Sequence, residues 1–306
     1  MTRKAARIRV EPLIAFGVPL FGGGLALPSM GSQWFVSSEH TGAFGRGDSF
    51  DHPLATIQAA VDAAAAGDMI FIAPGDYDEA VTITGKDDLV LVGCGGRGNV
   101  AVAPSATDAV AITISGTAAN RAQDITLINV GGEGNGTGGG LYVYGNVRRV
   151  RAVGCKFEGG AFATKLESTA AGSVGDTQLR DCEFAWTTTA LHLLASGGGD
   201  PVTNTYVKGC LFHNFTADGV LTSGTFATDL WIDDNVFAAQ EDGSEPTQYL
   251  DIDDAGTTGF VSNNVFATTV FDTASFAIAA GVLFANNISQ AENPSAAVGG
   301  TSGRPD

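Results

Sequence analysis

Beyond residue 124 the chain repeats one short pattern, and this repeat constrains the fold more than any other feature. Most copies read apolar residue, two further residues, Asn or Cys, any residue, Phe. The Asn or Cys positions are separated by 26, 27, 28, 25, 29 and 23 residues. A repeat of this length predicts a solenoid in which each copy forms one coil and stacks on the last. The aligned positions are Asn129, Cys155, Cys182, Cys210, Asn235, Asn264 and Asn287.

Stacking the coils places equivalent side chains in columns. Asparagine in the aligned column is expected to adopt the left-handed backbone of a turn and to bond to the asparagine of the next coil. Cysteine there is expected to act as a small apolar filler, because the four cysteines show neither CxxC spacing nor a zinc pattern with histidine. A second, inward column is expected to fill the interior with Phe157, Phe184, Phe212, Phe237 and Phe266.

One helical pattern precedes the repeats. Residues 53–66 carry apolar side chains at helical spacing, with Pro53 near the first turn and Gly67 just past the end. Short strands are expected at 34–38, 68–73, 80–84 and 89–92. The glycine-rich stretch 131–140 lacks the ending of a phosphate-binding loop and is expected to form a flexible turn between strands.

These segments resemble a known superfamily. Residues 53–66, followed by Gly67-Asp68 and by Ala73-Pro74-Gly75-Asp76-Tyr77, resemble the N-terminal cap and first coil of pectate-lyase-like proteins. The resemblance covers roughly residues 34–290 and implies an all-β chain: a single-stranded right-handed parallel β-helix with a short N-terminal capping α-helix. Residues 1–33 then form an N-terminal anchoring arm and 291–306 a C-terminal tail. The superfamily includes polysaccharide lyases and hydrolases, bacterial surface proteins and trimeric bacteriophage tailspikes or appendages, so the fold does not select the activity.

The charge of the chain is divided between its ends. The formal net charge is −17, yet the first ten residues hold four basic groups and no acid, which leaves −21 on the remainder. So acidic a body repels phosphate backbones, and nucleic acid is excluded as a partner. No stretch reaches the ~20 uninterrupted apolar residues of a membrane span. The 42 glycines and the excess of Asp (23) over Glu (10) favour turns between strands over helices.

The strand Tyr249–Asp254 carries the best candidate for catalysis. Alternation points Leu250 and Ile252 inward and Asp251 and Asp253 outward, with their Cα atoms about 6.6–7 Å apart. This overlaps the ~6.5–9.5 Å carboxyl separation of inverting glycosidases. His192 is expected in the same outward column, two coils or about 9.6 Å away. The hypothesis makes Asp253 the acid, Asp251 the base, and His192 a substrate-binding or pKa-tuning group; the alternative is solvated charges on an exposed strand.

A second acidic group consists of Asp233 and Asp234, with Asp181 two coils earlier in the Asp234 column and Gly209 between them. Calcium requires six to eight oxygen ligands, and two carboxylates separated by an empty coil supply too few. A solvated face is therefore favoured over a metal site. No cofactor is expected.

The architecture leaves three functions open. The first is a non-enzymatic virion structural protein, a phage head or tail appendage or spike on the particle surface, homotrimeric and anchored to other virion proteins through residues 1–33. It would adhere to surface polysaccharide, and trimerisation would cover exposed strand edges. The second is a β-helix glycoside hydrolase or polysaccharide lyase. The third is a secreted bacterial surface adhesin, which predicts signal cleavage near residues 29–31.

Overall fold

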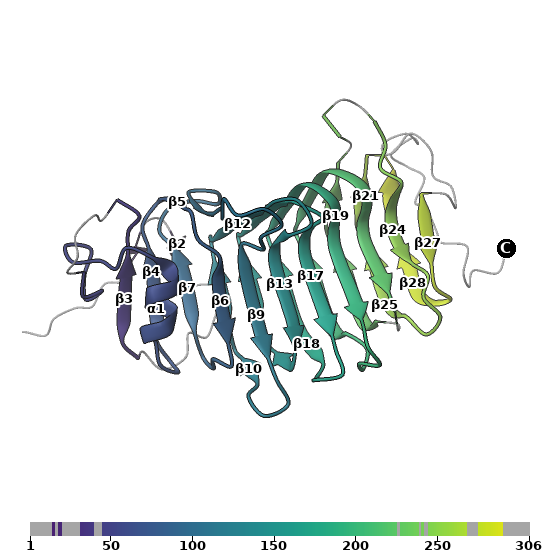
Figure 1. Cartoon of the computed structure of the whole chain (residues 1–306). Helices are drawn as coiled ribbons and strands as arrows, with labels where there is room; N and C mark the ends of the chain where they lie inside the picture. Colours follow the sequence, from purple (N-terminus) through teal and green to yellow (C-terminus); the bar gives the residue numbers. More distant parts are fainter. Residues whose placement is uncertain are drawn as a thin grey trace, which may run out of the picture.

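The chain folds into a parallel β-solenoid whose axis follows the sequence from one end to the other (Figure 1). The structure is a computed structural model and describes residues 31–39, 45–224, 227–238, 240–241, 244–267 and 275–289, with the backbone of 14–15 and 18–19. Two short strands near the N-terminus, β1 (Ile14–Ala15) and β2 (Val18–Pro19), pair in an antiparallel arrangement. Most of the arm expected at 1–33, and the whole tail expected at 291–306, lie outside the described residues.

Two sheets wind around the core, and every pairing between neighbouring coils is parallel. The first sheet contains, in spatial order, β3 (Gln33–Val36), β4 (Met69–Ile72), β7 (Val90–Gly93), β11 (Thr126–Ile128), β15 (Arg151–Val153), β18 (Val174–Arg180), β20 (Thr203–Lys208), β22 (Thr228–Asp233), β25 (Thr258–Ser262) and β28 (Gly281–Ala285). The short strands β10 (Ala122–Gln123) and β14 (Val147–Arg148) extend it along one side.

The second sheet bends and supplies the other two sides of each coil. One row of strands contains β5 (Gly75–Tyr77), β8 (Val100–Val102), β12 (Gly131–Gly134), β16 (Lys156–Gly159), β19 (Glu183–Ala195), β21 (Leu211–Ser223), β23 (Val236–Phe237), β26 (Val265–Phe266) and β29 (Ile288–Ser289). The other row contains β6 (Val81–Thr84), β9 (Ile112–Gly116), β13 (Gly139–Gly145), β17 (Phe162–Ser168), the second halves of β19 and β21, β24 (Gln248–Ile252) and β27 (Phe276–Ile278).

The phenylalanine column fills the interior as the repeat predicts. Phe157, Phe184, Phe212, Phe237 and Phe266 are in register from coil to coil, and each is fully buried. Successive ring centroids lie 6.2, 4.7, 4.3 and 4.7 Å apart. Such contacts add about 0.5–1.5 kcal/mol per pair beyond the burial of apolar area.

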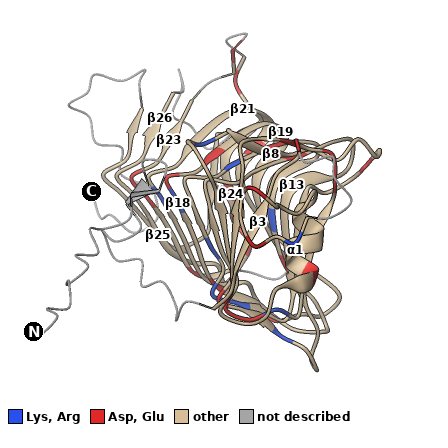
Figure 2. Ribbon diagram, turned by 90° about the vertical axis from the view of Figure 1, so that its left-hand side faces the viewer, with Lys and Arg blue, Asp and Glu red and all other residues tan. Residues whose placement is uncertain are grey.

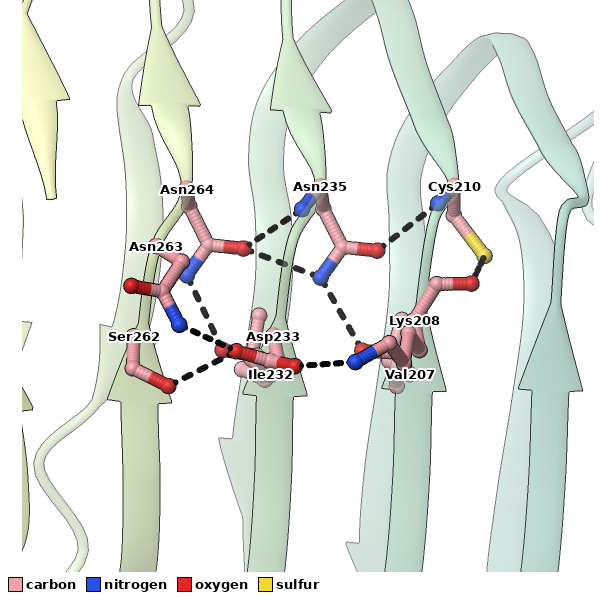
Figure 3. A network of polar contacts seen from close by, with 9 residues as sticks. All are labelled: Val207, Lys208, Cys210, Ile232, Asp233, Asn235, Ser262, Asn263 and Asn264. Atoms are coloured by element: carbon pink, nitrogen blue, oxygen red, sulfur yellow. Dashed lines mark hydrogen bonds and ion pairs between the residues drawn. The ribbon is translucent and has the colours of Figure 1, made fainter.

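The asparagine column forms the expected ladder (Figure 3). Asn235 Nδ2 donates to Asn264 Oδ1 at 3.0 Å. Beyond the residues drawn in the figure, Asn264 Nδ2 donates to Asn287 Oδ1 at 2.9 Å. Each amide also donates to a backbone carbonyl, those of Val207, Ile232 and Val261. The ladder therefore satisfies buried polar groups between coils, as close packing requires.

The sequence predicted a left-handed backbone at the aligned asparagines themselves, and this prediction is wrong for the ladder. The left-handed residue lies one position before each of them. Asn235, Asn264 and Asn287 follow a left-handed residue, and this bend turns the chain so that the next side chain points inward. Asn129 itself has φ +53°, and Val130, not Asn129, occupies the buried column beside Cys155. The left-handed positions are Asn129, Gly154, Asp181, Gly209, Asp234, Asn263 and Asn286.

The cysteines fill the same column as free, buried residues, which confirms their predicted role as fillers. The thiols of Cys155, Cys182 and Cys210 lie 3.4–3.5 Å from carbonyl oxygens of the preceding coil. Burial raises the pKa of the Cys94 thiol to about 11, so it stays protonated at neutral pH.

The capping helix α1 (Ile57–Ala63) lies near β3 and β4 and is shorter than the expected 53–66. It starts late because Leu54 pairs with Val36 in an isolated parallel bridge, which keeps residues before Thr56 extended. Thr56 caps the helix, and the Glu79 carboxylate accepts hydrogen bonds from the first two helical N–H groups at 2.7 and 2.9 Å. The helix ends at Ala63, because the next residue, Ala64, has an extended backbone with a ψ of 138°.

The glycine-rich stretch 131–140 is not a flexible turn, contrary to expectation. Most of it lies within β12 and the start of β13. A side chain at Gly132 would approach the Gly140 carbonyl oxygen within 2.5 Å, and one at Gly134 would approach the Gly139 backbone within 2.3 Å. These glycines allow the backbones of β12 and the start of β13 to approach closely.

Candidate functional site

The outer face of β13, β17, β19, β21 and β24 carries the predicted catalytic candidates. Its strands alternate between buried residues and partly exposed ones. One outward row runs, in register, through Tyr142, Lys165, His192, Leu221 and Asp251. His192 and Asp251 therefore share a column two coils apart, as the sequence predicted, with the apolar Leu221 between them.

Asp251 is the carboxylate with the most altered acidity on this face. Its pKa is raised to about 6, first by burial and then by the negative charges of Asp253, Asp218 and Asp254. Leu250 and Ile252 on either side are fully buried, and Asp253 is exposed. A carboxyl group with this pKa gains and loses its proton near pH 6, which suits proton transfer.

His192 lies apart from the aspartates. Its Nε2 is 2.6 Å from Ser223 Oγ. Burial, together with the nearby positive charge of Lys165, lowers the pKa of the imidazole to about 4, so the ring is neutral at physiological pH. With Leu221 intervening at a coil spacing of about 4.8 Å, the ring has no direct contact with Asp251. The structure thus brings Asp251 and Asp253 together and leaves His192 in a different group.

That group is centred on Glu167, which sequence reasoning missed. The Glu167 carboxylate accepts hydrogen bonds from the Tyr142 hydroxyl at 2.6 Å and the Ser196 hydroxyl at 2.5 Å, and it pairs with the Lys165 ammonium at 2.8 Å. Burial alone would raise the pKa of Glu167, but these three donors outweigh it and lower that pKa. Alternation in 141–145 and 164–168 is the sequence signal that could have placed these side chains on one outer face.

Aromatic rings complete the group. The Lys165 ammonium lies 5.2 Å from the centre of the Tyr142 ring and 5.9 Å from that of Phe162, within range of cation–π attraction. The Tyr142 and Tyr144 rings stack at 4.7 Å. The rings and the ammonium are partly exposed and the Glu167 carboxylate is buried, and their mutual contacts fix the positions of all of them.

The acidic residues considered for metal binding have other partners or lie apart. The Asp233 carboxylate pairs with Lys208 at 2.6 Å and accepts hydrogen bonds from Ser262 and Asn263 at 2.9 and 2.8 Å (Figure 3). Asp181 and Asp234 occupy left-handed bends on either side of Gly209. Within the described ranges, no three His, Cys, Asp or Glu side chains converge as metal ligands.

Positions of basic and acidic residues are interspersed along the ribbon of the solenoid (Figure 2). No helix in the described part of the chain is long and apolar enough to cross a membrane.

Comparison with known proteins identifies the fold. No family model and no curated protein matches the sequence. Among solved structures, the pectin methylesterase of Aspergillus niger is 16% identical with a TM-score of 0.58, covering 88% of this chain and 89% of its own. A mutant pectin methylesterase in complex with a hexasaccharide is 14% identical with a TM-score of 0.51, covering 87% and 92%. A protein of Geobacillus virus E2 is 14% identical with a TM-score of 0.43, covering 84% and 60%. The likeness to the two pectin methylesterases therefore shows that the chain has a right-handed parallel β-helix fold, as the sequence predicted.

Proposed function

We propose that this chain is a virion structural protein: a phage head or tail appendage that is anchored by residues 1–33 and binds host-surface carbohydrate with its solenoid. The observation that carries the binding role is the fixed arrangement around Glu167. Three donors already engage this carboxylate and lower its pKa, so it is a poor proton donor. Stacked rings beside an ammonium and a carboxylate suit the apolar face and the hydroxyl groups of a sugar.

The anchoring role rests on the distribution of charge. Four basic groups in the first ten residues precede a body of charge −21, so the basic end would dock on an acidic assembly surface while the body points away. Mass spectrometry of purified particles, combined with antibody labelling in electron micrographs, tests this proposal. The account expects the full-length chain on particles; a free secreted monomer that lacks residues 1–30 would overturn it and favour the surface adhesin.

Homotrimer formation is part of the proposal. An outward row on the first sheet runs through Tyr206, Trp231, Phe260 and Leu283, whose last two side chains are 38% and 53% exposed. The Trp231 ring stacks 5.4 Å from Tyr206 and 4.4 Å from Phe260. Association of three copies along this row would cover it. Light scattering of the purified full chain is expected to give three times the monomer mass of 31.2 kDa, and a monomer would contradict this part.

A polysaccharide-degrading enzyme is the second candidate, and the raised pKa of Asp251 beside Asp253 favours it. In that case Asp251, rather than Asp253, holds the proton and acts as the acid, and Asp253 acts as the base. Incubation with bacterial or algal polysaccharides followed by assays for reducing ends and unsaturated sugar tests it. Cleavage that disappears in Asp251→Asn supports the enzyme; no cleavage of any glycan supports a binding role.

A further inference from the structure

An exposed tryptophan lies in a backbone conformation that bulky residues rarely adopt. Trp186, at the bend within β19, has φ +52°. The residues in register with it on the neighbouring coils are Gly159 and Asn214, types that tolerate the left-handed region. The Trp186 side chain is 50% exposed, so core packing does not explain a tryptophan at this bend. Strained residues of this kind are concentrated at functional sites.

The indole borders a hollow of about 460 Å³, within the usual range for ligand pockets. The other lining residues are Gly160, Thr187, Thr188, Asn214, Thr216, Gln240 and Glu241. The last two lie between β23 and β24 in the sequence. The hollow thus combines one aromatic wall with hydroxyl, amide and carboxylate groups.

Hydrogen bonds below the surface hold this lining in place. Asn214 Oδ1 accepts from the Glu241 backbone N–H at 2.7 Å, which attaches the loop to the bend. Asn214 Nδ2 lies 3.0 Å from His213 Nδ1, and His213 Nε2 lies 3.2 Å from Glu183 Oε1. The His213 ring meets the Trp186 ring edge-on at 6.5 Å. The Trp186 indole therefore packs against the His213 ring on one side and borders the hollow with its exposed surface.

The remaining polar side chains point to a ligand rich in hydroxyl groups. Among the described residues, the side chains of Thr188, Gln240 and Glu241 have no hydrogen-bond partner, and Thr188 and Glu241 are exposed. Among the described residues that line the hollow, Glu241 alone is charged, and its charge is negative. A uronate would be repelled by this carboxylate, whereas neutral or amino sugars would not.

We propose that the hollow at Trp186 is a carbohydrate subsite that takes one pyranose of a neutral or amino sugar, stacked on the indole, and that it discriminates against uronates. The subsite lies at the bend of the coil, away from the Glu167 group on the outer face of β17. It rests on the proposed carbohydrate-binding function and specifies its ligand class.

An array of neutral, amino and uronic oligosaccharides, probed with the full chain, tests the subsite. Wild-type protein is expected to bind neutral or amino glycans. Trp186→Asn, which carries the residue found at the register neighbour Asn214, is expected to weaken that binding about ten-fold or more, because a tryptophan that its ligand covers often contributes most of the binding energy. Trp186→Phe is expected to retain most of it, and the matched control Phe50→Asn, an exposed aromatic that precedes the capping helix, all of it.

Thermal unfolding separates loss of the site from loss of the fold. Trp186→Asn is expected to melt at or above the wild-type temperature, because asparagine tolerates the left-handed backbone better than tryptophan. Preferred binding of uronates, or unchanged binding by a folded Trp186→Asn, would overturn the subsite and leave the proposed function standing. If the wild-type chain binds no glycan on the array, both the subsite and the carbohydrate role are wrong, whereas the virion location is tested separately on particles.

Discussion

The replacement Asn264→Ala tests how the coils are held together. The Asn264 side chain is fully buried and makes four hydrogen bonds. Its oxygen accepts from the Asn235 backbone N–H at 2.9 Å and from Asn235 Nδ2 at 3.0 Å. Its Nδ2 donates to the Ile232 carbonyl and to Asn287 Oδ1, both at 2.9 Å. At about 1 kcal/mol of net stability for each bond, the replacement is expected to cost ~4 kcal/mol, and more where a buried partner stays unsatisfied.

Chemical denaturation followed by circular dichroism measures this cost. Cys182→Ala is the matched control, since Cys182 occupies the same column, is equally buried and loses only weak sulfur contacts at 3.4 and 3.2 Å. The control is expected to cost about 1 kcal/mol, from a small loss of buried volume. Equal destabilisation by the two replacements would refute the claim that the asparagine ladder stabilises the C-terminal coils.

Three further replacements probe the core and the outer face. Phe212→Ala is expected to destabilise the chain by about 3–5 kcal/mol in the same denaturation assay, because it opens a cavity in the phenylalanine column; a loss below 1 kcal/mol would contradict the stacking. Glu167→Gln is expected to lower the pKa of Tyr142, which burial and the Glu167 carboxylate raise, and ultraviolet titration measures the change; an unchanged value argues against the contact. The pKa of Asp251 is about 6 in the folded chain and near 3.8 in the unfolded chain, so the free energy of unfolding falls as the pH rises from 4 to 6. Asp251→Asn should remove this contribution to the pH dependence of the free energy of unfolding. Identical pH dependence in the two proteins would contradict the raised pKa.

The repeat in the sequence predicted the coils because the same packing problem recurs in each of them. Phenylalanine at a fixed distance after the Asn or Cys column was sufficient to predict the interior stack from Phe157 to Phe266. The first of the aligned repeats was placed one residue out of register. Asn129 is an asparagine like the ladder residues, but it occupies the left-handed bend, and Val130 occupies the buried column. Asparagine suits both positions, one for its backbone and the other for its amide, so residue type alone could not separate them.

The candidate site was less predictable, because its contacts join side chains from different coils. Alternation was sufficient to predict the outward column of His192 and Asp251. Glu167 and its donors come from three successive coils: Tyr142 from β13, Lys165 from β17, and Ser196 from just after β19. The glycine content of 131–140 suggested a turn. In the structure most of these glycines lie in strands, where neighbouring backbone leaves no room for a side chain. The hollow at Trp186 was not predicted, because only the folded chain brings Gln240 and Glu241 beside Trp186.

Electron microscopy of purified particles tests the central claim most directly. The account predicts the solenoid projecting from the particle surface, with residues 1–33 at the point of attachment. Antibodies against the solenoid should label intact particles, and antibodies against residues 1–33 should not. Particles without this chain, together with a free protein in the medium that lacks residues 1–30, would contradict the account.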